Sequence, residues 1–454
     1  MSNAAIGSGA LPLQGSGTWL THWAPEDTEF WAAAGARVAW RKLAITTAAL
    51  MLSFATWFMV SALVVRLPAV GFRLSTGQLF WLAAMPGLAG GTLRILHTFM
   101  IPIFGSRHVV SFSTLLLLVP ALGWGFAVQN TATPYWILML LAFAAGFGGG
   151  IFSSVRPRTS LFFPKRLPGT ARAMQAGLGN LGVSLTQLVT PWIITAGGLA
   201  YLGAPQTLTK NGASKAVWLQ NAALWYVPLI VLLGVAAWSL VRSVPVRANF
   251  REQFDIFREK HTWFMTSLYI MTFGTFSGAS ASFPLLIKEL YGKFPNAPDP
   301  LTYAFLGPLI GSLSRVAFGP LADRIGGGIL TAVSGAGVLV CSVAVTFFTG
   351  PESMAEFPWF VGTMLALFFF SGIGNASTFR QMPVCFPPRQ ASGVIGWTAA
   401  VAAYGPFFFA VALGTLISTL GSPNLFFYGL AAFCLANVGI NWWYYTRPGA
   451  EKPC

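Results

Sequence analysis

The sequence predicts an all-α membrane protein whose twelve transmembrane helices form two pseudo-symmetric six-helix bundles. Its composition indicates a membrane, because 55% of the 454 residues are hydrophobic and only 9% are charged, whereas soluble domains contain about 25% charged residues. Twelve apolar stretches are long enough to cross a bilayer, which takes about 20 residues per helix. A segment of the first half recurs in the second half, and this repeat predicts the two bundles.

The predicted helices follow one another with short loops, and a charged amphipathic run divides them into two sets of six. We expect a cytoplasmic tail at 1–42, the first bundle at 43–241, a cytoplasmic linker at 242–261, the second bundle at 262–446 and a cytoplasmic tail at 447–454. The twelve predicted helices occupy residues 43–65, 77–102, 109–128, 135–155, 170–193, 220–241, 262–287, 300–320, 326–349, 358–379, 391–416 and 423–446.

Basic residues predict the orientation of these helices. With the N-terminus in the cytoplasm, most of the 27 Lys and Arg residues fall in cytoplasmic segments, as the positive-inside rule requires. We therefore expect a multi-pass protein of the cytoplasmic (inner) membrane, surrounded by the lipid bilayer, with both termini in the cytoplasm. The net charge of +15 is dispersed over loops, so no nucleic-acid partner is expected. The predicted outer loops hold Arg66, Arg73, Lys210, Lys215, Lys288 and Lys293.

The sequence contains none of the usual patterns of an enzyme. The four cysteines have no CxxC or metal-ligand spacing, so each is expected to be a small apolar filler. There is no phosphate-binding loop, and the twelve acidic residues fall in tails, loops or helix ends. We expect no catalytic residue, no metal and no cofactor, and we expect the protein to be monomeric.

Two arginines in apolar, glycine-bearing helices are the strongest functional signal. Arg94 lies in PGLAGGTLRILHTFMIPIFGSR (86–107), and Arg315 lies at the matching position of GPLIGSLSRVAFGPLADRIGGG (307–328). An arginine at bilayer depth costs roughly 2.5–3.5 kcal/mol on insertion scales, so it is retained where it faces a cavity, a partner or a substrate. Two arginines at repeated positions indicate an anion held between the halves. Guanidinium is planar and permanently charged, and therefore suits a flat oxyanion.

Other polar and aromatic residues leave two interpretations open. His97 follows Arg94 by three residues, on nearly the same helix face, and it is either a proton carrier or a hydrogen-bonded structural residue. Asn180 and Gln187 are two helical turns apart in a glycine-rich helix, where their amides could bind an oxyanion or join neighbouring helices. Phe54, near the middle of the first helix, could line a path or pack against lipid and core.

Several motifs together resemble one transporter family. GPLADRIGG (319–327) resembles the loop motif of the major facilitator superfamily. GGGIFSS (148–154), AGLGNLG (176–182) and TLR with FMIPIFG (92–105) are similar to the nitrate signature and arginine segments of the nitrate/nitrite porter family within it. This resemblance covers about residues 43–446 and implies the major facilitator fold, with transport of nitrate and nitrite by alternating access.

The resemblance also implies a set of binding residues. Arg94 and Arg315 would clamp one nitrate or nitrite ion, Asn180 and Tyr269 would be its polar neighbours, and Phe54, Phe152 and Phe273 would form aromatic walls. The sequence departs from the family pattern at Ile151, at Arg156-Pro157-Arg158, at Gln175 and in AAVAAYGP (399–406).

The mode of coupling stays open at the level of the sequence. Among the Asp, Glu and His residues, His97 alone is expected within the bundle, since no acidic residue is expected at mid-membrane. If His97 is structural, the arginines reorient only with a bound anion, and nitrate/nitrite exchange follows. If His97 titrates, nitrate/proton symport follows. We favour exchange, with proton symport as the alternative and an anion channel as a weaker one.

Overall fold

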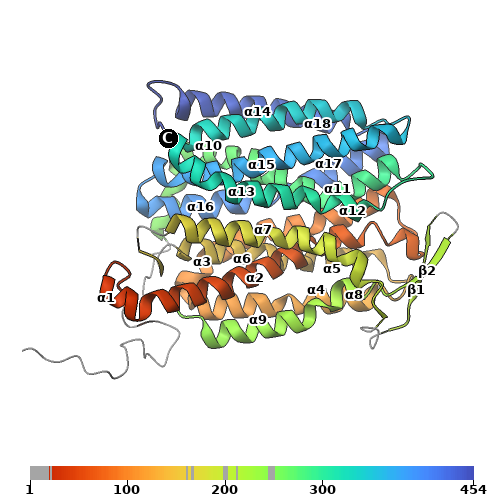
Figure 1. The fold of residues 1–454 in the computed structure, drawn as a ribbon, viewed down its shortest axis with the longest axis horizontal. Coiled ribbons are helices and arrows are strands. Elements are labelled where there is room, and N and C mark those ends of the chain that lie inside the picture. The colour runs from red at the N-terminus through yellow and green to blue at the C-terminus, as the bar shows by residue number, and fades with distance from the viewer. Residues whose placement is uncertain are drawn as a thin grey trace, which may run out of the picture.

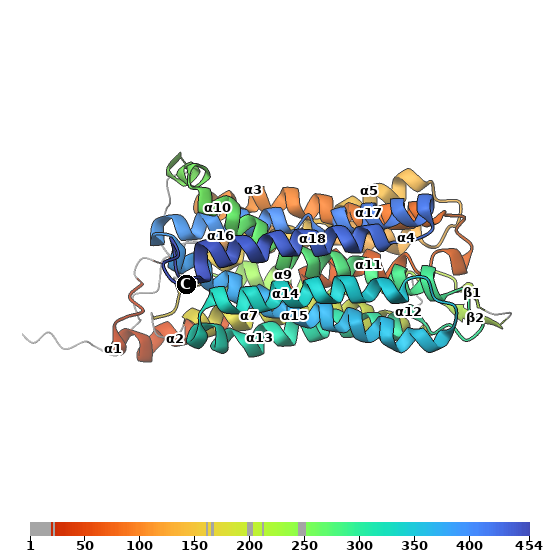
Figure 2. The same cartoon turned by 90° about the horizontal axis from the view of Figure 1, so that it is seen from above.

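The computed structural model describes residues 20, 23–159, 162–164, 168–197, 203–210, 213–243 and 251–454. Its long helices lie along one axis, with the first half of the chain on one side and the second half on the other (Figure 1). Helix α1 and the C-terminal end of the chain lie at the same end of the molecule, opposite strands β1 and β2 (Figures 1 and 2).

The described part of the first half contains six spans. The first span is longer than predicted, because its helix begins at Thr28 rather than near residue 43, and Asp27 caps it by accepting hydrogen bonds from two backbone amides. The second and third spans run together as α3 and are separated by a kink at Gly105. The helices are α1 (Thr28–Phe30), α2 (Ala36–Leu63), α3 (Thr76–Leu116), α4 (Leu118–Ala127), α5 (Tyr135–Ala145), α6 (Phe147–Thr159), α7 (Pro168–Ile193), α8 (Asn221–Leu224) and α9 (Tyr226–Leu240).

The described part of the second half also contains six spans. A short π turn interrupts the first of them, and another ends the last. The predicted linker is partly outside the described residues, and its residues 251–258 form a 3-10 helix. The helices are α10 (Lys260–Tyr269), α11 (Thr275–Tyr291), α12 (Pro300–Ala304), α13 (Leu306–Ile325), α14 (Gly327–Val345), α15 (Phe357–Cys385), α16 (Pro388–Ala402), α17 (Gly405–Leu420) and α18 (Asn424–Asn441), with π turns at Ile270–Gly274 and Trp442–Thr446.

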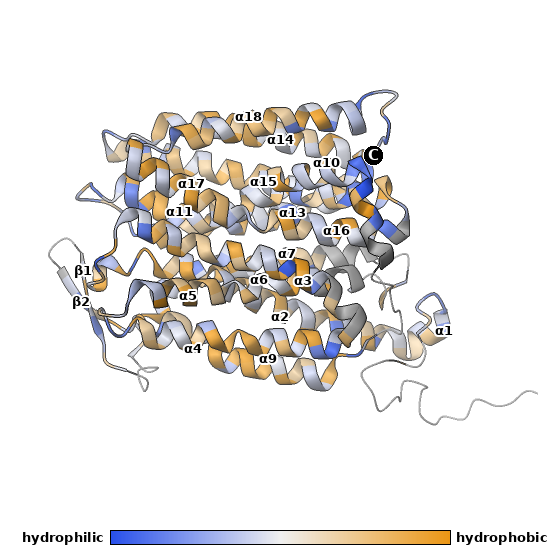
Figure 3. Ribbon diagram, turned by 180° about the vertical axis from the view of Figure 1, so that it is seen from behind, coloured by the Kyte–Doolittle hydropathy of each residue, from blue (hydrophilic) through white to orange (hydrophobic). Residues whose placement is uncertain are grey.

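These helices confirm the predicted fold class. Among the described residues, 11 helical segments are long and apolar enough to cross a membrane. Helix α7, with 26 residues, is also long enough and brings the number of spans to twelve. Hydrophobic residues, coloured orange, are distributed along all the long helices (Figure 3). A β-hairpin that the sequence did not predict, β1 (Gln206–Lys210) with β2 (Ala213–Val217), lies outside the spans between α7 and α8.

The predicted repeat is visible in backbone conformation. Gly105 and Gly326, which occupy matching positions in the two halves, have φ values of 79° and 97° and ψ values of 159° and 142°. A side chain rarely tolerates this positive-φ region, whereas glycine adopts it freely. The same glycine turn therefore links the second and third spans of each half.

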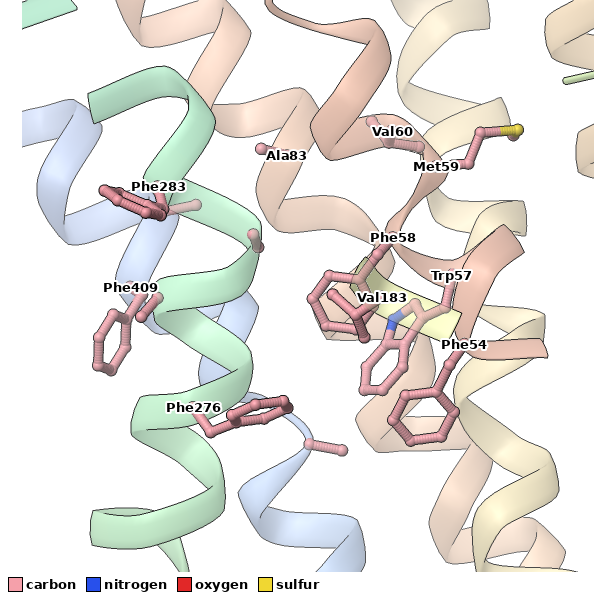
Figure 4. Packing of buried hydrophobic residues seen from close by; sticks show 14 of the residues in the cluster. Phe54, Trp57, Phe58, Met59, Val60, Ala83, Val183, Phe276, Phe283 and Phe409 are labelled. Carbon is pink, nitrogen blue, oxygen red and sulfur yellow. The ribbon is translucent and has the colours of Figure 1, made fainter. Parts of the chain in front are cut away.

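The repeat also governs how the helices pack. A Cβ atom at Gly90 would lie 2.8 Å from the ring of Trp57, and one at Gly311 would lie 2.7 Å from the ring of Phe276. Glycine thus admits a large aromatic ring against the arginine-bearing helix in both halves. Figure 4 shows the two rings facing the interior from α2 and α11.

Candidate anion-binding site between the two halves

Arg94 lies in α3 and touches both halves of the molecule. Its side chain is fully buried. Nε donates a 2.7 Å hydrogen bond to the carbonyl of Gly149 on α6, and Nη1 donates a 2.9 Å bond to the carbonyl of Ala399 on α16. Nη2 has no hydrogen-bond partner within the part of the chain that the structure describes. Two backbone carbonyls therefore orient the guanidinium and leave one of its donor nitrogens for a ligand.

Aromatic rings surround the Arg94 guanidinium. Its central carbon lies within 6 Å of four ring centroids, the range over which a cation is attracted by an aromatic face. These interactions partly compensate for the removal of the charge from water, and the rings exclude water from the site. The distances are 4.6 Å to Phe152, 5.0 Å to Trp57, 5.1 Å to Phe273 and 5.7 Å to Phe54.

Arg315, on α13, is the counterpart of Arg94. It is 3% exposed, and neither Nη1 nor Nη2 has a hydrogen-bond partner among the described residues. Its guanidinium carbon lies 5.3 Å from the ring of Phe379 on α15. Arg315 is also one of the electrostatic neighbours of Arg94. The structure thus brings two cations with unused donors from separate halves into one buried region.

Stacked rings join the two arginines across the interface between halves. Phe152 of the first half stacks on Phe273 of the second, with centroids 6.2 Å apart, and Phe273 in turn stacks on Tyr269 at 5.3 Å. Phe379 contacts both Phe152 and Tyr269 edge-on. Tyr269 directly precedes a π turn, and Phe273 lies within it. Such helix irregularities are common at functional sites.

Two neutral polar residues add further unused hydrogen-bonding atoms. The Tyr269 hydroxyl and both amide atoms of Asn180 are buried and have no hydrogen-bond partner in the described ranges of the chain. Gln187, on the same face of α7 as Asn180, donates to Ser61 of the first half and to the Ser280 carbonyl of the second. This face of α7 therefore points between the halves, and Asn180 lies on it two turns nearer the start of the helix.

His97 lies one turn after Arg94 on α3. Its side chain is buried, and a Cβ atom at Gly150 would lie 2.8 Å from its ring. The histidine therefore packs directly against α6, next to the Gly149 carbonyl that orients Arg94.

The structure gathers Arg94, Phe54, Phe152, Phe273 and Tyr269 into one cluster. Asn180 is buried on α7, and the structure adds further residues. Sequence reasoning missed Trp57 and Phe379, which contact the arginines, and the carbonyls of Gly149 and Ala399. Trp57 follows Phe54 by one helical turn, so helical spacing could have revealed it. The carbonyl of Ala399 gave no sequence signal, because every residue has one and only the packing of α16 on α3 selects it.

The departures from the family pattern occupy different environments. Gln175 is buried, where its Oε1 accepts from Thr159 at 2.7 Å and its Nε2 donates to Thr46 at 3.0 Å, so it joins α7 to α6 and α2. Ile151 is fully buried in the hydrophobic core. The side chains of Arg156, Pro157 and Arg158 lie outside the described residues.

The comparisons with known proteins bear on this geometry. The model of the Major Facilitator Superfamily matches residues 45–410 of the chain. The chain belongs to the major facilitator superfamily. A solved structure of a bacterial homologue of the human lysosomal transporter Spinster, inward-facing and occupied, aligns with a TM-score of 0.58 at 14% identity, covering 88% of this chain and 93% of that chain. At this identity the likeness concerns the fold alone.

Closer relatives place the chain within the nitrate/nitrite porter family of the major facilitator superfamily. A probable nitrate/nitrite antiporter, NarK2 of Thermus thermophilus, is 64% identical over 443 residues, which cover 96% of this chain and 99% of that protein. The nitrate/nitrite transporter NarU of Salmonella typhimurium is 36% identical over 451 residues, with 94% and 96% covered. This major facilitator protein is accordingly a multi-pass membrane transporter and not an enzyme.

Proposed function

We propose that this major facilitator protein exchanges nitrate and nitrite across the cytoplasmic membrane by alternating access. The names of its relatives give the substrates. The observation that carries the proposal is the pair of buried arginines, in which three guanidinium nitrogens, one on Arg94 and two on Arg315, lack hydrogen-bond partners among the described residues.

The chemistry of these atoms fits a small planar oxyanion. Nitrate and nitrite have oxygens that only accept hydrogen bonds. The unpartnered nitrogens of the arginines, the amide nitrogen of Asn180 and the hydroxyl of Tyr269 can all donate. A hydrogen bond to a charged group contributes about 1.5–3 kcal/mol. The rings of Phe54, Phe152 and Phe273 would exclude water from the anion and strengthen these interactions.

The charges of the two arginines also explain why the empty carrier would not switch between its inward-facing and outward-facing states, so that transport takes the form of exchange. Without an anion, the two guanidinium groups repel each other in a region that excludes water, where like charges interact strongly. A bound anion offsets this repulsion and permits the halves to close around it. The carrier therefore switches between inward-facing and outward-facing states only with nitrate or nitrite bound. Each anion carried in one direction is exchanged for an anion carried in the other.

Proton symport is the second candidate, since His97 lies one turn from Arg94. Its packing against Gly150 favours a structural role, because a ring held against a helix backbone has little room to reorient with a changing charge. We propose that His97 supports the α3–α6 contact and carries no proton. The twelve acidic residues lie in loops, in terminal segments or near helix ends, as a carrier driven by exchange would allow.

We further propose that the protein is monomeric and that both termini lie in the cytoplasm of an inner membrane. Helix α1 and the C-terminal end occupy the same end of the molecule (Figure 1), which an even number of spans requires. The distribution of basic residues places that end inside.

Counterflow in proteoliposomes tests the proposed exchange. Vesicles loaded with nitrite should take up labelled nitrate, while vesicles loaded with inert buffer should take up little, with or without an inward proton gradient. His97→Gln should retain uptake into nitrite-loaded vesicles, because glutamine keeps a buried hydrogen-bonding side chain without a titrating group. Strong uptake into buffer-loaded vesicles that depends on the proton gradient and is lost in His97→Gln would overturn exchange.

A further inference from the structure

Two cysteines far apart in the sequence meet at the end of the second half. Cys385 ends α15, and Cys454 lies in the segment that follows the last π turn. Their sulfur atoms are 3.4 Å apart, and the Cys385 thiol donates a hydrogen bond to the sulfur of Cys454. The other two cysteines, Cys341 and Cys434, are buried in α14 and α18.

The segment 447–454, which we call the C-terminal segment, is held in place by a set of specific contacts. Glu451 pairs with Lys260 at 2.7 Å and with Nε2 of His261 at 3.1 Å. Lys452 donates to the Cys385 carbonyl at 2.9 Å, and the carbonyl of Cys454 accepts from the amide of Gly328 at 2.8 Å. The segment is therefore bound to α10, α15 and the first turn of α14, and these contacts hold Cys454 against Cys385.

We infer that Cys385 and Cys454 form a reversible disulfide when the protein meets a hydroperoxide. Cys454 is partly exposed and Cys385 is buried behind it, so an oxidant from solvent reaches Cys454 first. A partly exposed thiol with a second thiol in contact is the usual arrangement of a redox-sensitive pair. Disulfides in the cytoplasm are usually transient, because glutathione and thioredoxin reduce them again.

The surroundings of Cys454 favour it as the nucleophile. The hydrogen bond from Cys385 lowers the pKa of the Cys454 thiol, and the positive charge of Arg380 acts in the same direction, while partial burial acts against this shift. The thiolate is the reactive form of cysteine.

The chemistry balances in two steps. The Cys454 thiolate attacks one oxygen of the hydroperoxide, the O–O bond breaks, and the leaving alkoxide takes up a proton to give an alcohol and a sulfenic acid on Cys454. The Cys385 sulfur then attacks the sulfenic sulfur, a disulfide forms and water leaves. The two thiols are oxidised, and the hydroperoxide is reduced to an alcohol and water. A dithiol reductant restores both thiols.

The test uses the full-length protein with Cys341→Ala and Cys434→Ala, so that Cys385 and Cys454 are the only thiols. After exposure to hydrogen peroxide, the protein is denatured and its free thiols are tagged with a maleimide polymer. We expect both tags to be lost together, the intact mass to fall by two hydrogen atoms, and dithiothreitol to restore both tags. The disulfide should be within one chain, so the protein should run as a monomer without reductant.

Two variants make the result decisive. The matched control with Cys385→Ser and Cys454→Ser, which retains Cys341 and Cys434, should keep both of its tags after the same treatment, because those thiols are buried and separate. A variant that carries Cys341→Ala, Cys434→Ala and Cys385→Ser retains Cys454 as its only thiol. Its intact mass should not fall by two hydrogen atoms after the same treatment. Retention of both tags by the Cys385/Cys454 protein, or a disulfide only between chains, would overturn the inference.

Discussion

The guanidinium of Arg94 is held by three kinds of interaction at once. Two backbone carbonyls accept hydrogen bonds from Nε and Nη1, four aromatic rings surround the central carbon, and Nη2 is left without a partner among the residues that the structure describes. A single charge in this position would destabilise a membrane bundle, whereas the carbonyls and rings compensate in part for its burial. The orientation that results points the remaining donor into the region shared with Arg315.

Replacing either arginine by lysine should impair binding while the charge is retained. Arg94→Lys and Arg315→Lys each remove the planar fork, and the loss of one charge-assisted hydrogen bond, about 1.5–3 kcal/mol, corresponds to a tenfold or greater loss in affinity. Nitrate counterflow and nitrate-dependent thermal stabilisation would measure the effect. The exposed Arg73, in the loop between α2 and α3, provides the matched control Arg73→Lys, which should behave as the parent. Normal saturable transport by both site variants would refute the proposed clamp.

Replacing Tyr269 by phenylalanine tests the contribution of its hydroxyl separately from that of its stacked ring. Tyr269→Phe retains the ring that stacks on Phe273 with an interplanar angle of 7°, so the fold and the aromatic wall should be preserved. Loss of the unpartnered donor should weaken nitrate binding by about tenfold if it contacts the anion. Titration of nitrate against thermal stability measures this affinity. An unchanged affinity would place the hydroxyl outside the binding site.

At the scale of helices, the glycines set how closely the elements approach. Gly148 of α6 lies against the backbone of α2, and a Cβ atom there would lie 2.1 Å from the Ser53 carbonyl oxygen. In the second half, Gly374 of α15 lies against Thr272 in the π turn beside Tyr269. Small residues permit such close helix contacts in membranes. These glycines bring the aromatic residues of the first and seventh spans to the arginines.

An added methyl group at Gly148 should therefore separate two helices. Gly148→Ala should destabilise the protein by about 1–3 kcal/mol, because the clash is with backbone that cannot rotate away. Gly362→Ala is the matched control, since Gly362 also lies in a transmembrane helix but has nothing within 4 Å of the added atom. Alanine there should be neutral or slightly stabilising, since its helix propensity exceeds that of glycine. Equal melting temperatures of the two purified variants would contradict the packing argument.

At the scale of the whole molecule, polar contacts join the two halves at the end that bears the β-hairpin. Arg66, just after α2, pairs with Asp299, which also caps α12 through its other oxygen. Thr76 at the start of α3 donates to Glu289 near the end of α11 at 2.8 Å. In a protein that works by alternating access, these contacts must separate when this end opens.

Removing the charge of Asp299 should favour that opening. Asp299→Asn retains an oxygen for the helix cap but weakens the pair with Arg66. A loss of about 1 kcal/mol, the upper range for exposed pairs, shifts the population about fivefold. Spin labels at Arg73→Cys and Glu352→Cys, in a protein without native cysteines, would report the distance between the two halves at this end of the molecule.

The matched control for this experiment is Asp27→Asn, which removes the charge from another helix cap, that of α1. It should leave the distance distribution between the labels unchanged, while Asp299→Asn should enrich the longer distances. The double exchange Arg66→Asp with Asp299→Arg should restore the shorter ones. Identical distributions in all of these proteins would exclude a role for the pair in closing this end.

The sequence by itself determined the features that depend on composition and on local periodicity. The membrane location, the number of spans, the two halves and the repeated arginines all followed from residues close together in the chain or from a constant spacing. A burial cost acts on each residue individually, so an arginine within an apolar helix marks a site without any knowledge of its neighbours.

Only the tertiary structure decided which atoms meet. The carbonyl of Ala399 on Arg94, the stack of Phe152 on Phe273 and the contact of Cys385 with Cys454 each join segments that are distant in sequence. Helical periodicity specifies which face a side chain occupies, but the neighbour of that face depends on the packing of all the helices together. The polar partners of the arginines were therefore beyond the reach of the sequence, while the arginines themselves were not.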